Sequence, residues 1–343
     1  MLDEWFFLYI PRLFCALSFL VNPIFVYLIF SEKSANFGNY RFLLLSFAVF
    51  NLIYSVVNVL VPLDIHSYGY CCFLTVRHGP FSEVSEFNFH MLVGRCSLVS
   101  ASYAIILLHF VYRYLVVQKS SLTDRNFHWY MTISAFVLVL YFVTWHAICY
   151  FPGRANVETR EYIRKDFLEI YGTDSMNCNM IGTLFRGGSG ETTFRSWAAT
   201  IMVTLLSVAS IFSFLIMAKK VIFQTQIKQK LLTFQIMYKL KKMTVNASKK
   251  TVKLQFELLR ALIVQTVIPI FISFSPCLLC WYSPVFDIQL PRGFNYLELS
   301  ALGLFAFVDP VAIILCLPIL RKRIFCFNRH NSSIAVGVEG IKD

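Results

Sequence analysis

The chain has 343 residues, of which 57% are hydrophobic and only 15% are charged, and 35 of them are Phe. Soluble domains contain about 25% charged residues, and a soluble fold of this composition would expose large apolar patches that promote aggregation. The composition therefore excludes an ordinary cytosolic enzyme, a disordered tail and a small disulfide-stapled domain. It predicts a protein that crosses a membrane several times.

Seven apolar stretches approach the roughly 20 residues that a helix needs to cross a bilayer. In chain order they cover residues 6–30, 41–63, 91–116, 128–151, 196–218, 256–283 and 296–318. Prolines interrupt several stretches, and membrane helices tolerate them as kinks because neighbouring groups bond the freed carbonyls. The sequence predicts an all-α fold, a bundle of seven transmembrane helices that forms a single domain over residues 1–343.

Lys and Arg are unequally divided between the two sides of this predicted bundle. Of the 31 basic residues, 20 lie in segments 31–41, 113–125, 219–254 and 319–343. The long loop 152–195 on the other side balances six basic residues with six acids. Because basic loops face the cytoplasm, we expect an extracellular N-terminus and a cytoplasmic C-terminus. The start of the chain lacks a positive n-region and a cleavage site, so the first span is expected to act as a signal anchor.

Arg113, between Tyr112 and Tyr114, ends the third span on its cytoplasmic side. A guanidinium there can bond neighbouring helices in one state and a partner protein in another. The alternative is an arginine that only extends to the membrane surface. Within seven spans of this orientation, we interpret Arg113 as part of a switch.

Asp309, followed by Pro310, lies deep in the seventh span. A carboxylate at that depth costs about 2.5–3.5 kcal/mol on insertion scales, so it is a candidate functional group, and the proline predicts a kinked, movable helix. The alternative is an acid that Asn22 or Asn51 of neighbouring helices satisfies by hydrogen bonding.

A further set of residues predicts an outward-facing ligand cavity. Arg95 lies in the outer half of the third span, and residues one or two turns below it recur at helical spacing. A mostly apolar cavity with a few polar groups is typical of ligand sites. The alternative is a structural ion pair of Arg95 with Glu298 or Glu86. The other candidate lining residues, from the third, fourth and sixth spans, are Val99, Ser102, Tyr103, His146, Trp281 and Tyr282.

The segments outside the spans give weaker indications. Segment 219–254 holds ten Lys and no acid, so we expect an amphipathic extension of the fifth helix that contacts anionic lipids or a signalling protein, not nucleic acid. Cys326, after the last span, is a candidate for palmitoylation. Cys178 and the pair Cys71 and Cys72 lie in extracellular loops, so one disulfide from Cys178 to Cys71 or Cys72 is expected. No metal site, cofactor or enzymatic motif is expected.

The chain resembles the nematode serpentine chemoreceptors of the Str superfamily, nearest to the Srj branch, which have the architecture of rhodopsin-like G-protein-coupled receptors. The resemblance rests on FGNYRFLL (37–44), FNLIYS (50–55), HFVYRY (109–114) and LQFELLRALIVQTVIP (254–269), together with Asp309-Pro310. It covers essentially the whole chain. Each segment alone is a weak signal, and the combination is specific.

The resemblance implies a receptor that binds a small odorant or pheromone outside and activates a heterotrimeric G protein inside, in the plasma membrane or a sensory cilium. Arg113 then matches the arginine of the DRY-like motif, with Tyr112 in place of its acid. Asp309-Pro310 matches the NPxxY-like kink, and the sixth helix moves at Pro269 and Pro276. A ligand with an acidic or carbonyl group is expected near Arg95. The alternative from another class is a transporter or a ligand-gated channel subunit.

Overall fold

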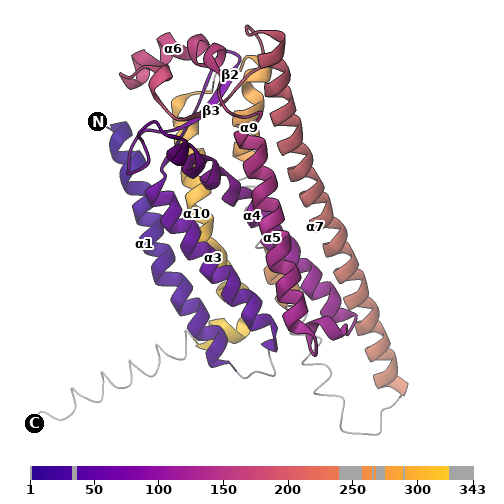
Figure 1. The fold of residues 1–343 in the computed structure, drawn as a ribbon. Helices are drawn as coiled ribbons and strands as arrows, with labels where there is room; N and C mark the ends of the chain where they lie inside the picture. The colour runs from indigo at the N-terminus through magenta and orange to yellow at the C-terminus, as the bar shows by residue number, and fades with distance from the viewer. Residues whose placement is uncertain are drawn as a thin grey trace, which may run out of the picture.

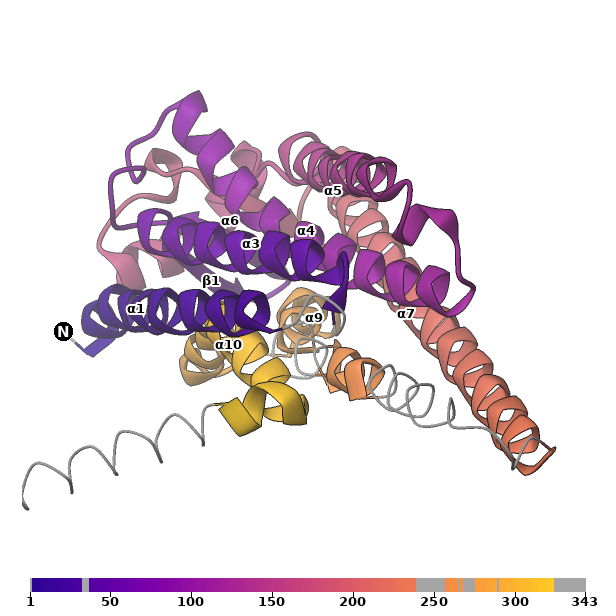
Figure 2. The same cartoon turned by 90° about the horizontal axis from the view of Figure 1, so that it is seen from below.

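A computed structural model describes residues 2–32, 37–238, 257–264, 266–267, 275–288 and 290–323. Long helices dominate it: α1 (Leu2–Ser31), α3 (Tyr40–Leu60), α4 (Glu86–Val117), α5 (Phe127–Tyr150), α7 (Gly190–Tyr238) and α10 (Arg292–Cys316). The short helix α9 (Ser275–Tyr282) and a helical stretch over 257–264 complete the bundle, which Figures 1 and 2 show from the side and from below.

Within the described residues, five helical segments are long and apolar enough to cross a membrane. They are Tyr9–Ser31, Tyr40–Leu60, Glu86–Val117, Phe127–Tyr150 and Gly190–Gln224, and a shorter apolar helix covers Ser300–Cys316. These segments lie where six of the seven spans were predicted. The predicted sixth span is described only in part, so the count of seven spans stays a prediction.

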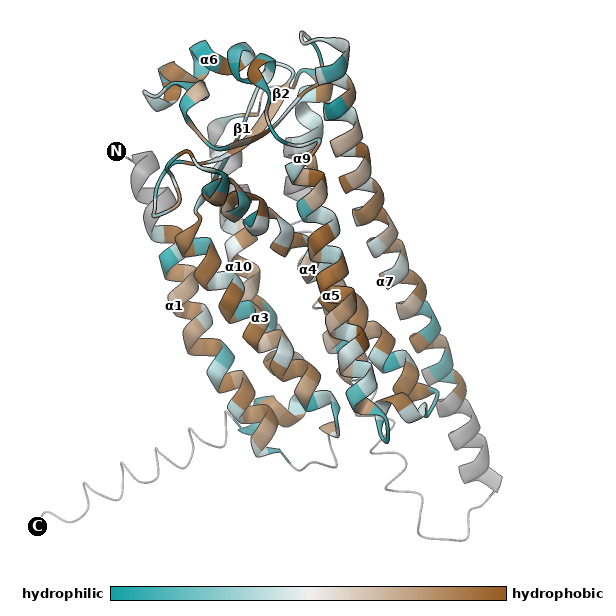
Figure 3. Ribbon diagram, viewed as in Figure 1, coloured by the Kyte–Doolittle hydropathy of each residue, from teal (hydrophilic) through white to brown (hydrophobic). Residues whose placement is uncertain are grey.

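α4 and α7 extend beyond the spans that were predicted for them. α4 begins five residues earlier than predicted because the Ser85 side chain accepts a hydrogen bond from the backbone N–H of Asn88 and so caps the helix. α7 begins at Gly190 and continues past the apolar segment to Tyr238. Many large apolar side chains on the bundle helices face outward, among them Phe136 of α5 and Leu205 of α7, which are 68% and 63% exposed. Figure 3, coloured by residue hydropathy, shows that hydrophobic residues predominate along the bundle helices, as expected for helices in lipid.

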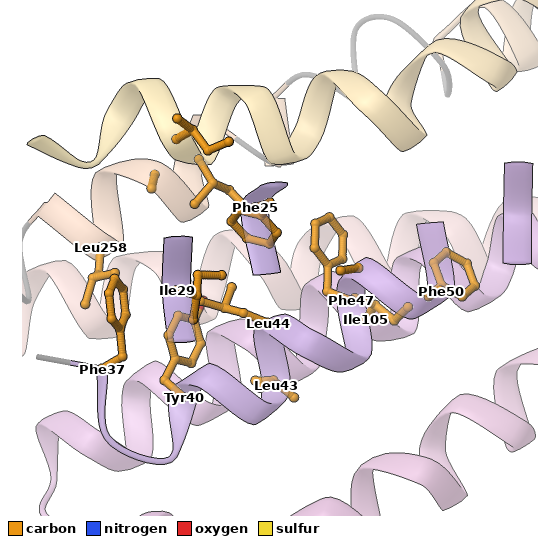
Figure 4. Close-up of a cluster of buried hydrophobic side chains, with 14 of the residues drawn as sticks. Phe25, Ile29, Phe37, Tyr40, Leu43, Leu44, Phe47, Phe50, Ile105 and Leu258 are labelled. Carbon is orange, nitrogen blue, oxygen red and sulfur yellow. The ribbon is translucent and has the colours of Figure 1, made fainter. Parts of the chain in front are cut away.

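The helices pack in two groups that meet at α3 and α4. α1 packs against α3 and α10, whereas α4 packs against α5 and α7. A large apolar cluster joins the groups, with Phe25 from α1, Leu44 and Phe47 from α3, and Ile105 from α4. Figure 4 shows these side chains meeting between the helices.

The fold is mostly helical, as expected, but it is not all-α, because an antiparallel sheet closes one end of the bundle. Its strands β1 (Leu63–Tyr68), β2 (Cys71–Val76) and β3 (Met180–Leu184) lie in the order β1-β2-β3. β1 and β2 form a hairpin with a two-residue turn in which Gly69 has a φ of +53°, a conformation that favours glycine. β3 comes from the long loop between α5 and α7.

The sheet is buried on both faces. Leu74 pairs with Ile65 and Ile181, and these three side chains pack onto the helix bundle. The neighbouring Phe73 points the other way and packs against Phe167 of α6 (Val157–Tyr171), with ring centroids 5.6 Å apart. We call the sheet together with α6 the cap, and the opposite end of the bundle, where α3 begins and α4 ends, the far end (Figure 1).

α6 is held over the sheet by capping at both of its ends. The Asn156 side chain accepts a hydrogen bond from the Thr159 N–H, and Gly172 ends the helix in the left-handed conformation, with a φ of +68°. Glu158 accepts hydrogen bonds from the Thr192 hydroxyl and the Ser189 N–H, which tie α6 to the start of α7. These bonds hold the pKa of the Glu158 carboxyl below its usual value.

Candidate functional site

An apolar cavity of about 70 Å³ lies directly beneath the cap. Leu63, Ile65, Leu74 and Ile181 of the sheet close it on the outside. Side chains from α4, α5, α7, α9 and α10 form its remaining walls. We call it the ligand cavity because it lies where a ligand site was predicted and has the apolar lining that such sites share.

Three of the predicted ligand residues line this cavity: Val99 and Tyr103 of α4 and Trp281 of α9. The sequence analysis missed further lining residues, which include Trp145 of α5, Ser207 of α7 and Leu302 of α10. Only the placement of the fourth, fifth and seventh helices around α4 reveals them. All of the described residues that line the cavity are uncharged.

Tyr282, Ser102 and His146 were predicted in this site but do not line the cavity. Tyr282 lies near it and connects α9 to α7 through a 2.6 Å hydrogen bond between its hydroxyl and that of Thr204. The Ser102 hydroxyl donates to the Val99 carbonyl within α4. His146 stacks on His90 at a more exposed position, with a ring nitrogen of each 3.1 Å apart.

Arg95 also turns away from the ligand cavity. Its guanidinium lies over the ring of Tyr54 on α3, 4.6 Å from the ring centroid, and one of its terminal nitrogens donates to the Tyr54 hydroxyl at 3.2 Å. The Tyr54 ring packs in turn against Phe305 of α10, with centroids 4.4 Å apart. The alternative ion pair of Arg95 with Glu86 is wrong, because Glu86 pairs with Arg154; the side chain of Glu298 lies outside the described residues.

Arg113 is buried at the far end, with 2% of its surface exposed. The carbon at the centre of its guanidinium lies 3.6 Å from the centroid of the Tyr40 ring, the geometry of a cation–π contact. The Tyr40 hydroxyl lies 2.9 Å from Nδ1 of His109, one turn before Arg113 on α4. Arg113 is therefore held against α3 by an aromatic ring that α4 itself orients.

The two tyrosines beside Arg113 differ in environment. Tyr112 is buried, stacks on Tyr40 with centroids 5.2 Å apart, and meets the edge of Tyr130 of α5 at 5.4 Å. Tyr114 lies nearer the surface, where its hydroxyl accepts a hydrogen bond from Gln118. Tyr112 thus helps to position the Tyr40 ring beneath Arg113.

Pro310 lies inside α10 and removes one backbone hydrogen bond from that helix. The carbonyl of Ala306, four residues earlier, accepts a hydrogen bond from the Asn22 side chain of α1 at 3.1 Å instead. The Asn51 amide of α3 donates in turn to Asn22. The proline therefore creates a polar connection among α1, α3 and α10.

Asp309 is 2% exposed, and its Oδ1 atom has no hydrogen-bond partner within the described part of the chain. The bonds of Asn22 and Asn51 run to Ala306 and to each other, so the alternative in which they satisfy Asp309 gains no support from these contacts. Pro276 is the second residue of α9, whereas Pro269 and Cys326 lie outside the described residues.

The predicted disulfide from Cys178 to Cys71 or Cys72 is not formed in the part of the chain that the structure describes. Cys72 pairs in the sheet with Thr183, five residues along the chain from Cys178. Such an offset is about 16 Å in extended chain, and a disulfide needs Cα atoms about 4–7 Å apart. The structure therefore does not bring together the residues of the predicted disulfide.

Several residues in these contacts were not predicted as site residues, among them Tyr40, Tyr54, His109 and Ala306. Arg95 and Arg113 are separated by about five full turns of helix, so both project from one side of α4. That spacing indicated that one neighbouring helix contacts both arginines. The sequence does not say which helix this is.

Comparison with known proteins gives the family. A family described as "Serpentine type 7TM GPCR chemoreceptor Srj" matches residues 1–324. The chain belongs to the Srj family of serpentine chemoreceptors. As a Srj receptor it is a membrane-spanning G-protein-coupled receptor of the plasma membrane, in a receptor class that is not an enzyme family.

Individual relatives agree with this placement. Serpentine receptor class J-38 of Caenorhabditis elegans is 61% identical over 327 residues, which cover 95% of this chain and 94% of the relative. Serpentine receptor class r-10 of Caenorhabditis briggsae is 24% identical over 338 residues, covering 92% of this chain and 90% of the relative. The C. elegans G-protein coupled receptor str-33 is 24% identical over 151 residues, 44% of each chain.

Proposed function

We propose that this Srj receptor binds a small apolar odorant or pheromone in the ligand cavity and activates a heterotrimeric G protein at the far end. The observation that carries the proposal is the position of α4. Val99 and Tyr103 of this helix line the cavity beneath the cap, and Arg113 lies buried at its other end. A rotation or shift of one rigid helix can therefore connect the two sites.

The proposed ligand is uncharged. Every lining side chain in the part of the chain that the structure describes is uncharged, and burying an unpaired charge there is strongly unfavourable. This changes the expectation of an acidic ligand, because Arg95 is engaged with Tyr54 on the side of α3. The polar lining groups suit a ligand with one or two hydrogen-bonding atoms, such as a ketone or an alcohol.

The contact between Arg113 and Tyr40 serves as the resting-state lock. In the family motif this role belongs to an acid, but Tyr112 stands at that position in this chain. A cation–π contact is worth about 0.5–2 kcal/mol, which is enough to bias an equilibrium by about 2- to 30-fold. Activation releases Arg113 from the ring, so that its guanidinium becomes available to the G protein.

The proposed arrangement has seven spans, with the cap and N-terminus outside and the C-terminus inside, in the membrane of a sensory cilium. Epitope tags at both ends of live-cell receptors test the orientation, together with glycosidase treatment at Asn246 and Asn331. An accessible N-terminus, a hidden C-terminus and unmodified asparagines are expected. A glycosylated Asn246 would place the Lys-rich segment outside and contradict coupling to an internal G protein.

The coupling itself is tested by guanine-nucleotide exchange on a panel of heterotrimeric G proteins, driven by the purified receptor in lipid nanodiscs. Arg113→Ala should lower the exchange rate per receptor by about 10- to 100-fold, the loss expected for one hydrogen bond to a charged group. Arg125→Ala, a basic residue in the loop that follows, is the matched control and should stay within twofold. Equal exchange by wild type and Arg113→Ala would contradict the proposed switch.

A further inference from the structure

A second cavity, of about 150 Å³, lies between α3, α4 and α5 in the half of the bundle away from the cap. Phe47 and Phe50 of α3, Ile105 of α4 and Leu138 of α5 line it. Figure 4 shows the first three of these side chains. The cavity shares no lining residue with the ligand cavity, so it is a separate site. We call it the side cavity.

The side cavity opens on the membrane face of the bundle. Two exposed residues, Ser46 of α3 and Ala135 of α5, belong to its lining. Both lie more than one turn inside helices that are apolar enough to span the bilayer. The Ser46 hydroxyl donates to the Phe42 carbonyl of its own helix at 3.0 Å. A molecule dissolved in the lipid phase therefore has access to this cavity without crossing water.

One buried polar atom of the side cavity's lining residues has no partner. His109 is 2% exposed, and its Nε2 makes no hydrogen bond with any described residue. Its other ring nitrogen, Nδ1, is engaged with the Tyr40 hydroxyl at 2.9 Å. Buried polar groups are satisfied in the great majority of cases, by protein, by water or by a ligand. Among the described residues His109 Nε2 is therefore left without a partner, as expected for an atom that bonds to a ligand.

The chemistry of the histidine restricts that partner. If Tyr40 donates to Nδ1, then Nε2 carries the proton and needs an acceptor; in the other tautomer Nε2 is itself the acceptor. A hydroxyl group satisfies either tautomer because it both donates and accepts. The Ser134 hydroxyl, also in the lining, already donates to the Tyr130 carbonyl at 2.8 Å. Among the described lining residues, His109 alone can carry a charge.

We propose that the side cavity binds an uncharged amphiphile from the lipid phase, whose single hydroxyl bonds to His109 Nε2 and whose apolar body lies against Phe47, Ile105 and Leu138. A hydroxyl that accepts from Nε2 fixes the tautomer in which Nδ1 accepts from Tyr40. Tyr40 then stays beneath Arg113, 3.6 Å from the guanidinium carbon. The occupant therefore lowers basal G-protein activation, a consequence that rests on the proposed function, whereas the binding itself does not.

Photo-crosslinking of the full chain in phosphatidylcholine nanodiscs tests the binding. The probe is a long-chain primary alcohol with a diazirine in its chain, and the matched probe is the same chain without the hydroxyl. The alcohol should label peptides that contain residues 43–50 or 131–138, about fivefold more than the hydrocarbon at equal concentration, as expected for one net hydrogen bond. Equal labelling by the two probes would overturn the proposal.

Variants and competitors sharpen the test. Ala135→Leu fills the mouth of the side cavity and should lower labelling at least fivefold. Ala209→Leu adds the same atoms at an exposed alanine of α7 and should leave labelling unchanged. Competition experiments use the wild type and so do not depend on the folding of a variant. Cholesterol in the nanodisc represents a membrane lipid, and octanol added from water represents an environmental alcohol. Competition by either identifies the source, and competition by neither overturns the proposal.

Probe labelling tests binding in the side cavity, and nucleotide exchange tests the proposed receptor function. Labelling requires no G protein, so labelling without any change in nucleotide exchange supports the side cavity and contradicts the lock. Exchange that depends on Arg113 but no selective labelling supports the receptor function and overturns the side cavity.

Discussion

The two ends of α4 carry the same pair of residue types, an arginine that lies over a tyrosine of α3. At the cap end, Arg95 lies 4.6 Å from the Tyr54 ring centroid, and at the far end Arg113 lies 3.6 Å from that of Tyr40. The pairs differ in what holds the tyrosine. Tyr54 bonds to Arg95 and packs against Phe305 of a third helix, whereas Tyr40 is held by His109 and Tyr112, both on α4.

This difference indicates different roles for the two pairs. The Arg95 pair connects α3, α4 and α10, so its loss disturbs three helices and it serves as an anchor. In the Arg113 pair the contact with the Tyr40 ring joins α4 to the first residue of α3. A small separation of α3 from α4 is enough to break it, which is what a reversible lock requires.

The largest expected effect is on stability at the anchor. Tyr54→Ala removes a fully buried ring and leaves the Arg95 guanidinium without its hydrogen-bond acceptor, which should cost about 3–5 kcal/mol. Tyr40→Ala should cost about half as much, because its contacts involve fewer helices. Thermal unfolding of the two purified variants measures the difference. Equal losses would remove the distinction between anchor and lock.

A second, smaller effect concerns the polar connection at Pro310. Asn22→Leu leaves the Ala306 carbonyl without that donor and should cost about 1–3 kcal/mol. Pro310→Ala supplies a backbone N–H that can bond to the same carbonyl, so Asn22→Leu should cost clearly less in that background. Thermal unfolding of the single and double variants forms the cycle. Full additivity would mean that Asn22 does not compensate for the proline.

The smallest effect is a pH dependence confined to the cap. The Met176 N–H, together with the Arg164 guanidinium, lowers the pKa of the Asp174 carboxyl in the folded state. Its stabilising contribution is therefore fully present above the unfolded pKa of about 3.9 and is lost as the pH falls through the lower folded value. Thermal stability should depend less on pH below 4 in Asp174→Asn than in wild type. Identical pH profiles would contradict this contribution.

The membrane helices were the elements predicted best, because the length of a run of apolar residues is enough to define them. The sheet was missed because its strands are only five or six residues long and lie in loops between spans. The turn at Gly69, between two runs with β-branched or aromatic residues, was the available signal. Such a signal is weak beside a run of 20 apolar residues.

The residues of the ligand cavity and of the Arg113 contact were predicted only in part, for a related reason. Arg113 could be recognised from its own position at the end of a span, but its partner Tyr40 depends on how α3 is rotated. Val99 and Arg95 share one stretch of α4, yet a long arginine side chain can reach a neighbouring helix while valine faces the cavity beside it. Contacts between helices are set by packing, which a single sequence does not reveal.

The central claim is that the Tyr40 ring holds Arg113 in the resting state. The most direct test is ligand-independent nucleotide exchange by purified receptors in nanodiscs, compared among wild type, Tyr40→Leu, Tyr54→Leu and Tyr40→Leu combined with Arg113→Ala. Tyr40→Leu should raise basal exchange per folded receptor by about 2- to 30-fold, Tyr54→Leu should not, and adding Arg113→Ala should abolish the rise. Unchanged basal exchange in Tyr40→Leu, or a rise that survives Arg113→Ala, would contradict it.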